Sequence, residues 1–405
     1  MTRVTSKLAT RSSAPCCDQG LSRRRFLRNA GLVAGAGVIT STFGSAFLQA
    51  ALASTGASTN ILLVLSMRGG ADGLSLVVPH GDPAYALARP RIAVPRGALL
   101  AQDEMFGLHP MFAPLMPMWT AGTFAAVNAV GLAVPNRSHF AAMEEISPVE
   151  ATQLGSPIVP TALYGDSPVL AVADSDDMTL PGRDSPEAYA RRVASLRQAF
   201  SDELGPLGRG ARAALDMSEV FADVAGQPGA PENGAVYPLG DVGRALADAA
   251  RLVRADIGAE VITVDCGGWD MHVGIGDVDG GLMTSSVTEL ALALYAFFVD
   301  LGAAGSRVTV VTISEFGRRV EENSNRGLDH GWGNVMLLLG AGVKGGRYHG
   351  TWPGLGDGKL VEGDLAVTND YRSVLAEVVS TRFGADVSKV FPGFRPTPIG
   401  VMAAA

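Results

Sequence analysis

The sequence predicts an α/β fold with a mostly parallel central sheet and helices on both faces. Three observations predict it: five short apolar runs have the length of buried strands, a longer run between two of them has helical spacing, and polar or glycine-rich segments follow the strands. The apolar runs span residues 61–66, 124–130, 260–265, 308–313 and 335–339. A chain of 405 residues, 47% hydrophobic and 18% charged, can bury a large core, which excludes a coiled coil, a disordered chain and a small disulfide scaffold.

The helices are predicted from length and apolar spacing. Residues 287–301 connect the third and fourth strands, as a crossover helix does in a parallel sheet. Two further amphipathic helices are expected over 185–200 and 243–257, separated by a Pro- and Gly-rich stretch. We interpret the segment from about 150 to 258 as a helical cap or insertion over the sheet. A last helix is expected to end near Phe383.

The N-terminus reads as an export signal. Residues 22–28 are Ser-Arg-Arg-Arg-Phe-Leu-Arg, and an apolar run over 30–53 ends in Ala-Leu-Ala. The paired arginines resemble the twin-arginine signal, so we expect the twin-arginine translocation machinery as a partner and a periplasmic or secreted location. Residues 1–53 would be the signal peptide and 54–405 a single α/β domain without a stable membrane span. The alternative is an uncleaved membrane anchor.

Charge and cysteine content restrict the partners of the exported chain. Removal of residues 1–53 takes away seven of the 32 basic residues and one of the 40 acidic residues, so the formal charge changes from −8 to −14. Such a chain offers no basic stripe to a nucleic acid. Cys266 is then the only cysteine, so no internal disulfide can form.

Polar motifs follow the predicted strands. In open α/β sheets, ligands bind beyond the carboxyl ends of the strands. The first four strands are followed by RGGADG (68–73), NRSHF (136–140), GGWDMH (267–272) and SEFGRR (314–319), and DHGWGN (329–334) leads into the fifth. We therefore expect carboxylates, imidazoles, a serine and arginines to converge on one edge of the sheet.

The histidines indicate a metal site at this edge. Three of the six histidines in the chain (His139, His272 and His330) lie in these motifs. Asp270 with His272 and Asp329 with His330 form two acid–imidazole pairs, a ligand mix that suits zinc, manganese or iron. The alternative is a set of hydrogen-bonded structural loops.

Other residues keep two interpretations each. Ser138 fits an N-cap of a helix over 140–146. Glu315 and Arg318 fit an internal ion pair, and His349 is either a loop residue or a late metal ligand. These alternatives stay open from the sequence.

The ordered motifs RGGADGLS, NRSHF, GGWDMH, SEFGRR and DHGWGNVMLLLG resemble the family known as a domain of unknown function, DUF1501. The resemblance covers the chain from residue 61 to about 394. It implies a place in the alkaline-phosphatase and sulfatase superfamily, whose members use a two-metal centre at the strand ends and a Ser, Thr or modified Cys nucleophile. The [CS]-x-P-x-R motif of sulfatases is absent from this sequence.

Carried over to this chain, the resemblance implies two divalent metal ions and a serine nucleophile. Asp72, Asp329 and His330 would bind one ion, and Asp270, His272 and His349 the other. Ser138 lies where the nucleophile belongs, and Arg137 or Arg318 would neutralise the substrate oxygens. The spacing of Asp270 and His272 is tighter than in alkaline phosphatases.

The expected function is therefore an exported metal-dependent hydrolase of phosphate or related esters. Its substrate would be a small molecule or a polymer and not a nucleic acid. The alternative is a non-catalytic periplasmic binding or envelope-assembly protein on the same fold.

Overall fold

The fold was analysed in a computed structural model, which describes residues 37–43, 46–52, 59–135, 137–139, 169–171, 185–202, 208, 211–212, 215 and 229–403. Five strands of its main sheet lie where the apolar runs predict them, within one residue at each end. They are β3 (Ile61–Met67), β6 (Phe124–Gly131), β8 (Ala259–Cys266), β9 (Val308–Ile313) and β10 (Asn334–Gly340). Almost all of their side chains are buried, which explains why the runs are continuous and do not alternate with polar residues.

The sheet is mixed, with a parallel centre. Its order is β11-β6-β10-β9-β3-β8-β2-β1-β7, and β12 pairs with β6 beside this path. β3 runs parallel to both β8 and β9, whereas β10 runs antiparallel to β9 and β6. The edge strands are short: β11 (Arg347–His349), β12 (Asn369–Asp370) and β7 (Val169–Ala171). Because β10 is reversed, its amino end meets the carboxyl ends of β9 and β6.

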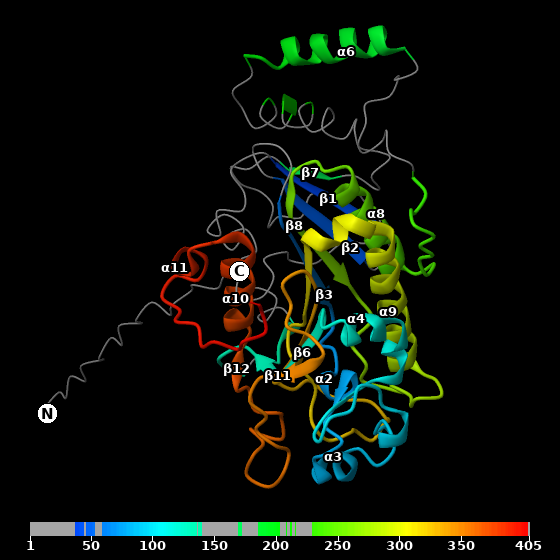
Figure 1. The fold of residues 1–405 in the computed structure, drawn as a ribbon, viewed down its shortest axis with the longest axis vertical. Helices are drawn as coiled ribbons and strands as arrows, with labels where there is room; N and C mark the ends of the chain where they lie inside the picture. The colour runs from blue at the N-terminus through cyan, green and yellow to red at the C-terminus, as the bar shows by residue number, and fades with distance from the viewer. Residues whose placement is uncertain are drawn as a thin grey trace, which may run out of the picture.

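Helices cover both faces of the sheet, as predicted (Figure 1). One face packs against α8 (Asp241–Arg254) and α9 (Leu282–Leu301), and α10 (Tyr371–Phe383) covers the other. Successive side chains of β3 divide between the two cores, Leu63 facing α8 and α9 and Leu62 facing α10. Each fully buried aliphatic side chain of this kind stabilises the fold by about 1.5–3 kcal/mol.

Capping residues set the bounds of α10. The Asp370 side chain accepts a hydrogen bond from the Arg372 backbone N–H at 2.9 Å. The helix ends at Gly384, which adopts a left-handed conformation with φ of 61°. This end agrees with the prediction of a helix to about Phe383.

Smaller elements surround the sheet. Before β6 lie α2 (Gly73–Leu76), β4 (Val77–Val78), α3 (Pro83–Ala88), η1 (Arg96–Ala98), β5 (Gly107–Leu108), η2 (Pro110–Leu115) and α4 (Met116–Thr120). Later in the chain come α6 (Pro186–Ala199), η5 (Gly302–Arg307) and α11 (Val387–Val390). The predicted helices at 185–200, 243–257 and 287–301 correspond to α6, α8 and α9. α8 packs on α9 and β8, so this part of the predicted cap belongs to the core. A helical cap or insertion over the rest of residues 150–258 stays a prediction.

Two strands lie inside the predicted signal peptide. β1 (Gly37–Phe43) and β2 (Ala46–Leu52) pair antiparallel with each other, and β2 pairs antiparallel with β8. β1 also pairs parallel with β7. Assignment of residues 1–53 to an export signal stays a prediction.

Among the described residues, one helical segment is long and apolar enough to cross a membrane. This segment, Leu282–Arg307, contains α9, and half of its most apolar part is buried inside the protein. Its buried face includes Leu290, Leu294 and Phe297, which pack in the core with α8. A core helix of a folded protein meets the same length and composition criteria.

Candidate metal centre

The polar motifs meet at one edge of the sheet. His139 follows β6, Asp270 follows β8, and Glu315 follows β9. His330 precedes β10, and the reversal of this strand brings it to the same edge. The convergence expected from the sequence therefore occurs, although the fifth strand runs in the opposite direction to its neighbours.

Three of these residues form a candidate metal-binding group. One ligand atom each from His139, Asp270 and His330 lies within 4.8 Å of the other two. Oδ1 of Asp270 lies 3.4 Å from Nε2 of His330 and 3.8 Å from Nε2 of His139. Two imidazoles and a carboxylate form a donor set that zinc, manganese or iron accepts.

His272 joins the same group. Its Nε2 atom lies 3.1 Å from Oδ1 of Asp270 and 3.0 Å from Nε2 of His330. We refer to His139, Asp270, His272 and His330 together as the histidine cluster. Three of its members were predicted as ligands, but the family resemblance implied that they bind two separate metal ions.

The Nδ1 atom of each imidazole faces an acceptor outside the cluster. For His330 it is the backbone carbonyl of Arg137, at 2.8 Å. For His272 it is Oδ1 of Asp329, at 3.3 Å, and for His139 it is Oε1 of Glu315, at 3.8 Å. Because a carbonyl and a carboxylate only accept, the protons of His330 and His272 belong on Nδ1, and their Nε2 lone pairs are directed into the cluster; the 3.8 Å contact of His139 is longer than a hydrogen bond.

Arg318 contacts the cluster from the protein interior and is almost completely buried, with 1% of its side chain exposed. Its guanidinium donates to Oδ1 of Asp270 at 2.6 Å and lies 3.4 Å from Nε2 of His272. Its other hydrogen bonds go to the backbone carbonyls of Gly69, Gly70, Trp269 and Leu328. These contacts engage Arg318 with the protein itself, so it holds Asp270 and the surrounding loops in place.

The surrounding charges shift the pKa values of the cluster. Burial opposes ionisation of Asp270, but the hydrogen bond and charge of Arg318 outweigh it and lower the pKa of this carboxyl. Burial lowers the pKa of His330, against the opposing hydrogen bond to the Arg137 carbonyl. Both shifts favour the deprotonated forms, which are the forms that bind a metal ion.

Glu315 links His139 to the glycine loop after β3. It is buried, and it accepts hydrogen bonds from the backbone N–H groups of Gly69 and Gly70 at 2.9–3.0 Å. Burial opposes its ionisation, but the nearby His139 imidazole and the hydrogen bonds from the two glycines outweigh it and lower the pKa of Glu315. The sequence suggested a pair with Arg318, whereas Arg318 binds Asp270.

The glycine loop approaches the cluster too closely for a side chain. Gly69 has φ of +113°, and a Cβ atom there would lie 2.5 Å from the backbone nitrogen of Asp270. A Cβ atom on Gly70, whose φ is +74°, would lie 2.5 Å from the ring of Phe316. Only glycine fits both the conformation and the space.

Three predicted ligands lie outside the cluster. Both carboxylate oxygens of Asp72 accept hydrogen bonds from the fully buried Arg89, at 2.5 and 2.9 Å. His349 lies in β11, where its Nε2 atom contacts the Lys344 carbonyl at 2.8 Å. Asp329 is near the cluster and contacts it through Nδ1 of His272.

The predicted nucleophile and the second predicted arginine lie on the loop after β6. Ser138 is exposed and directly precedes His139. The helix over 140–146 that Ser138 would cap lies outside the described residues. Nε and Nη2 of Arg137 donate to the buried Asp364 at 2.8 and 2.6 Å. Sequence analysis did not identify Asp364 or Asn323 as site residues; the Asn323 amide donates to Oδ1 of Asp329 at 3.0 Å.

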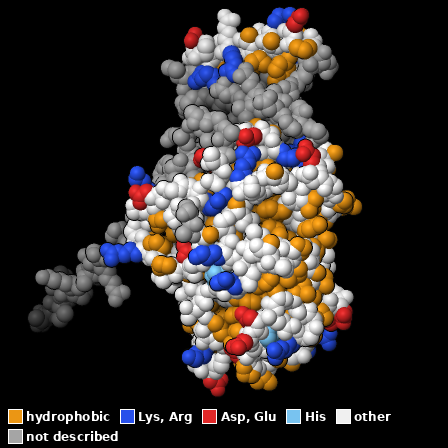
Figure 2. All heavy atoms as spheres, in the orientation of Figure 1, with side chains coloured by type: hydrophobic (Ala, Val, Ile, Leu, Met, Phe, Trp, Pro, Cys, Tyr) orange, Lys and Arg blue, Asp and Glu red, His pale blue; other side chains and the backbone are white. Residues whose placement is uncertain are grey.

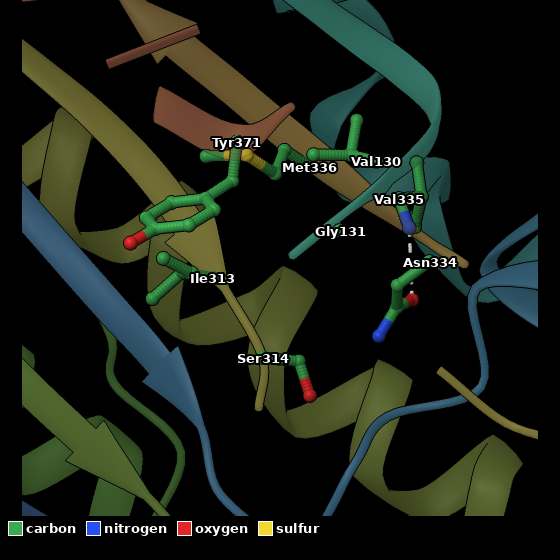
Figure 3. Close-up of a pocket in the computed structure, with 8 residues that line it drawn as sticks. All are labelled: Val130, Gly131, Ile313, Ser314, Asn334, Val335, Met336 and Tyr371. Atoms are coloured by element: carbon green, nitrogen blue, oxygen red, sulfur yellow. Dashed lines mark hydrogen bonds between the residues drawn. The ribbon is translucent and has the colours of Figure 1, made fainter. Parts of the chain in front are cut away.

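A small, partly open pocket lies between β6, β9, β10 and α10 (Figure 3). Its lining is mainly apolar, with Ser314 and Asn334 as polar members. Ser314 Oγ accepts from the Ala71 N–H at 2.9 Å, and the Asn334 amide donates to the Ala71 carbonyl at 3.0 Å. None of its eight lining residues belongs to the histidine cluster.

Comparison with known proteins identifies a family. A family model described as a protein of unknown function (DUF1501) matches residues 142–376. The matched region includes Asp270, His272 and His330 and begins three residues after His139. No curated protein and no solved structure matches the chain. The match covers more than half of the sequence, and the chain therefore belongs to the DUF1501 family.

Proposed function

We propose that this chain is an exported metal-dependent hydrolase of phosphate or related esters, with a divalent metal ion bound by the histidine cluster. The fold would be that of the alkaline-phosphatase superfamily. The protein would be exported through the twin-arginine pathway. The order of the motifs along the sequence supports this assignment. The positions of Asp72 and His349 favour one metal ion at the cluster over two.

One observation supports the metal site most strongly. Nε2 of His272 and Nε2 of His330 face each other at 3.0 Å, while both Nδ1 atoms face acceptors. Two imidazole lone pairs at this distance repel unless a cation or a proton lies between them. Oδ1 of Asp270 lies 3.1 and 3.4 Å from the same two atoms and supplies a negative ligand.

A bound divalent ion would act as a Lewis acid on the ester oxygens and on the attacking oxygen. The chain would supply the geometry. Asp329 and the Arg137 carbonyl fix His272 and His330 in one tautomer, and Arg318 fixes Asp270. Ser138, which is exposed, would attack the phosphorus: its Oγ–P bond forms while the bond to the leaving oxygen breaks, the hydroxyl proton passes to solvent, and the leaving oxygen takes up a proton from solvent and departs as the alcohol. A water molecule would then cleave the Oγ–P bond and return free serine and phosphate.

Metal analysis of the full chain, purified without chelator or affinity metal, tests the proposal. We expect about one equivalent of zinc, manganese or iron. His139→Ala, Asp270→Ala and His330→Ala should lose the ion, whereas His349→Ala should keep it as a matched imidazole control. Loss of ester hydrolysis in Ser138→Ala, with the metal retained, would support the nucleophile. No bound metal after incubation with each ion would reject the proposal.

A second candidate is a non-catalytic binding or envelope-assembly protein on this fold. The observation that favours it is the ion pair between Arg318 and Asp270, which already gives the carboxylate a positive partner. In that case one imidazole of the His272–His330 pair carries an extra proton, and the cluster serves to hold the loops together. Metal analysis separates this candidate from the hydrolase.

A further inference from the structure

His272 is the most exposed imidazole of the histidine cluster. The exposed fraction of its side chain is 40%, against 29% for His139 and 22% for His330. Figure 2 shows imidazole side chains at the surface of the drawn face, among acidic and basic side chains. The rings of His139 and His330 also pack against the buried ring of Phe316, at centroid distances of 4.8 and 4.6 Å. Hydrogen bonds therefore have to hold His272 in place.

The side-chain amide of Asn323 supplies two of these hydrogen bonds. Its Nδ2 atom donates to the backbone carbonyl of His272 at 2.9 Å and to Oδ1 of Asp329 at 3.0 Å. The same Oδ1 atom lies 3.3 Å from Nδ1 of His272. One NH₂ group thus fixes the main chain of His272 and also the carboxylate that faces its ring. Both of its protons are used.

The oxygen of the same amide closes the loop between β9 and β10. Oδ1 of Asn323 accepts hydrogen bonds from the backbone N–H groups of Asn325 and Gly327, at 2.9 and 3.0 Å. The backbone N–H of Asn323 donates to the Gly327 carbonyl at 2.9 Å. This loop lies directly against His272, because a Cβ atom on Gly327 would collide with the His272 carbonyl. The closed loop therefore fixes the amide nitrogen beside His272.

We infer that Asn323 is a positioning residue for the metal site: its NH₂ group keeps Nε2 of His272 within reach of the ion. This inference rests on the proposed function. Asn323 is not a ligand itself, because its amide is fully engaged by protein groups. Loss of the NH₂ group would release the His272 ring and the Asp329 carboxylate together. Groups that orient a ligand imidazole in this way typically contribute a factor of about 10–100 to metal affinity.

A role limited to loop closure makes a different prediction. Asparagine and aspartate both close turns of this kind through a side-chain oxygen. Asn323→Asp would keep an oxygen facing the two backbone N–H groups of the loop. It would replace the NH₂ group by a second oxygen, which faces the His272 carbonyl and Oδ1 of Asp329. The loop would then stay closed, whereas the two contacts that support His272 would become repulsive.

Asn325 provides a matched control. It is exposed, lies two residues later in the same loop, and takes part in the turn through its backbone N–H. Asn325→Asp adds the same negative charge to the same loop without placing an oxygen between Asp329 and His272. Added negative charge near a cation site should leave the affinity unchanged or raise it slightly. A loss of affinity in Asn323→Asp would therefore not be an effect of charge.

The experiment measures Zn²⁺ affinity of the full chain by competition with a chromophoric chelator. We expect Asn323→Asp and the neutral variant Asn323→Ala to weaken zinc binding about 10–100-fold, and Asn325→Asp to keep the wild-type affinity. Urea unfolding of the metal-free forms checks that each variant is folded. The ¹⁵N shifts of the His272 ring provide a second readout. They should place the proton on Nδ1 in the metal-free wild type and in Asn325→Asp, and show loss of this preference in Asn323→Asp.

The outcomes separate the two claims. Wild-type zinc affinity and the wild-type tautomer of His272 in Asn323→Asp would overturn this inference and leave Asn323 with loop closure alone. Equal losses of affinity in Asn323→Asp and Asn325→Asp would also overturn it, because charge would then account for both. Absence of bound metal in the wild type would instead overturn the proposed function. The tautomer of His272 would still show whether Asn323 holds the imidazole.

Discussion

The backbone carbonyl of Arg137 accepts a hydrogen bond from Nδ1 of His330 at 2.8 Å, although 193 residues separate the two in the chain. A backbone acceptor cannot be removed by substituting a side chain. Its position depends instead on what holds the loop, and the Arg137 side chain does so by donating two hydrogen bonds to Asp364. The same residue therefore contacts the cluster through its main chain and the interior through its side chain.

Arg137→Ala should destabilise the protein by about 2–4 kcal/mol, because it leaves the carboxylate of Asp364, 1% exposed, without its hydrogen-bond donor. Urea unfolding measures the loss. The double variant Arg137→Ala with Asp364→Asn should recover part of it, since no unpaired charge then remains. A double variant as unstable as the sum of the two single variants would contradict the coupling.

The stability that Arg137→Ala loses should depend on pH, with a larger loss at higher pH. Burial raises the pKa of Asp364 above its ordinary value of 3.8, and Arg137 opposes that shift. Without Arg137 the pKa rises further, so the folded state loses stability as the pH increases from 3.8 through the raised value. Arg137→Ala should thus lose more stability relative to the wild type at pH 7 than at pH 4.

Gly69→Ala should cost more than about 2 kcal/mol, since it combines left-handed backbone strain with a clash against the Asp270 backbone. Metal affinity should fall as well, because Asp270 must move. The matched control is Gly97→Ala, where a Cβ atom would meet nothing within 4 Å and where we expect little change. Equal unfolding midpoints for the two variants would refute the close approach of the two loops.

Glu315→Gln should reduce the acid sensitivity of the fold. The pKa of Glu315 is lowered in the folded state, so its contribution is present above its ordinary value of 4.5 and is lost as the pH falls through the lowered value. At pH 7 the variant should be less stable by about 1–3 kcal/mol. Near pH 3 the difference should narrow, and unfolding by urea across this range would show it. A difference that does not change with pH would contradict the assignment.

Asp72→Asn should weaken folding without affecting metal content. It leaves the fully buried Arg89 without its charged partner, which costs about 3–5 kcal/mol in buried pairs. Metal analysis of the folded fraction should match the wild type, because Asp72 is not part of the histidine cluster. Loss of one metal equivalent in this variant would restore the two-metal arrangement that the sequence suggested.

The sequence was most informative about the strands. A continuous apolar run such as 308–313 is typical of a strand buried on both faces, and β9 has these bounds. The direction of each strand could not be predicted, because an apolar run does not show whether a strand is parallel or antiparallel to its neighbour. The reversal of β10, which brings His330 to the carboxyl ends of β6 and β9, therefore had to come from the structure.

The candidate site was predictable in its location and not in its grouping. Motif positions placed Asp270, His272 and His330 at one edge correctly. The partners that decide each role are distant in sequence: Arg89 engages Asp72, and Glu315 orients His139. Nothing in the pattern of either motif specifies such a pairing, so Asp72 resembled a ligand, and His139, although counted among the motif histidines, was not assigned as a ligand.

The buried guanidinium of Arg318 gives Asp270 a positive partner that is part of the chain itself. In small zinc domains the ion is the core, and chelation unfolds the protein. Here the Arg318 guanidinium, which is part of the chain, donates hydrogen bonds to four backbone carbonyls and one carboxylate. It holds these groups together with or without an added ion. A chelator should therefore lower the melting temperature by an amount set by the binding free energy of the ion and still leave the protein folded, because the Arg318 anchor remains after the ion has left.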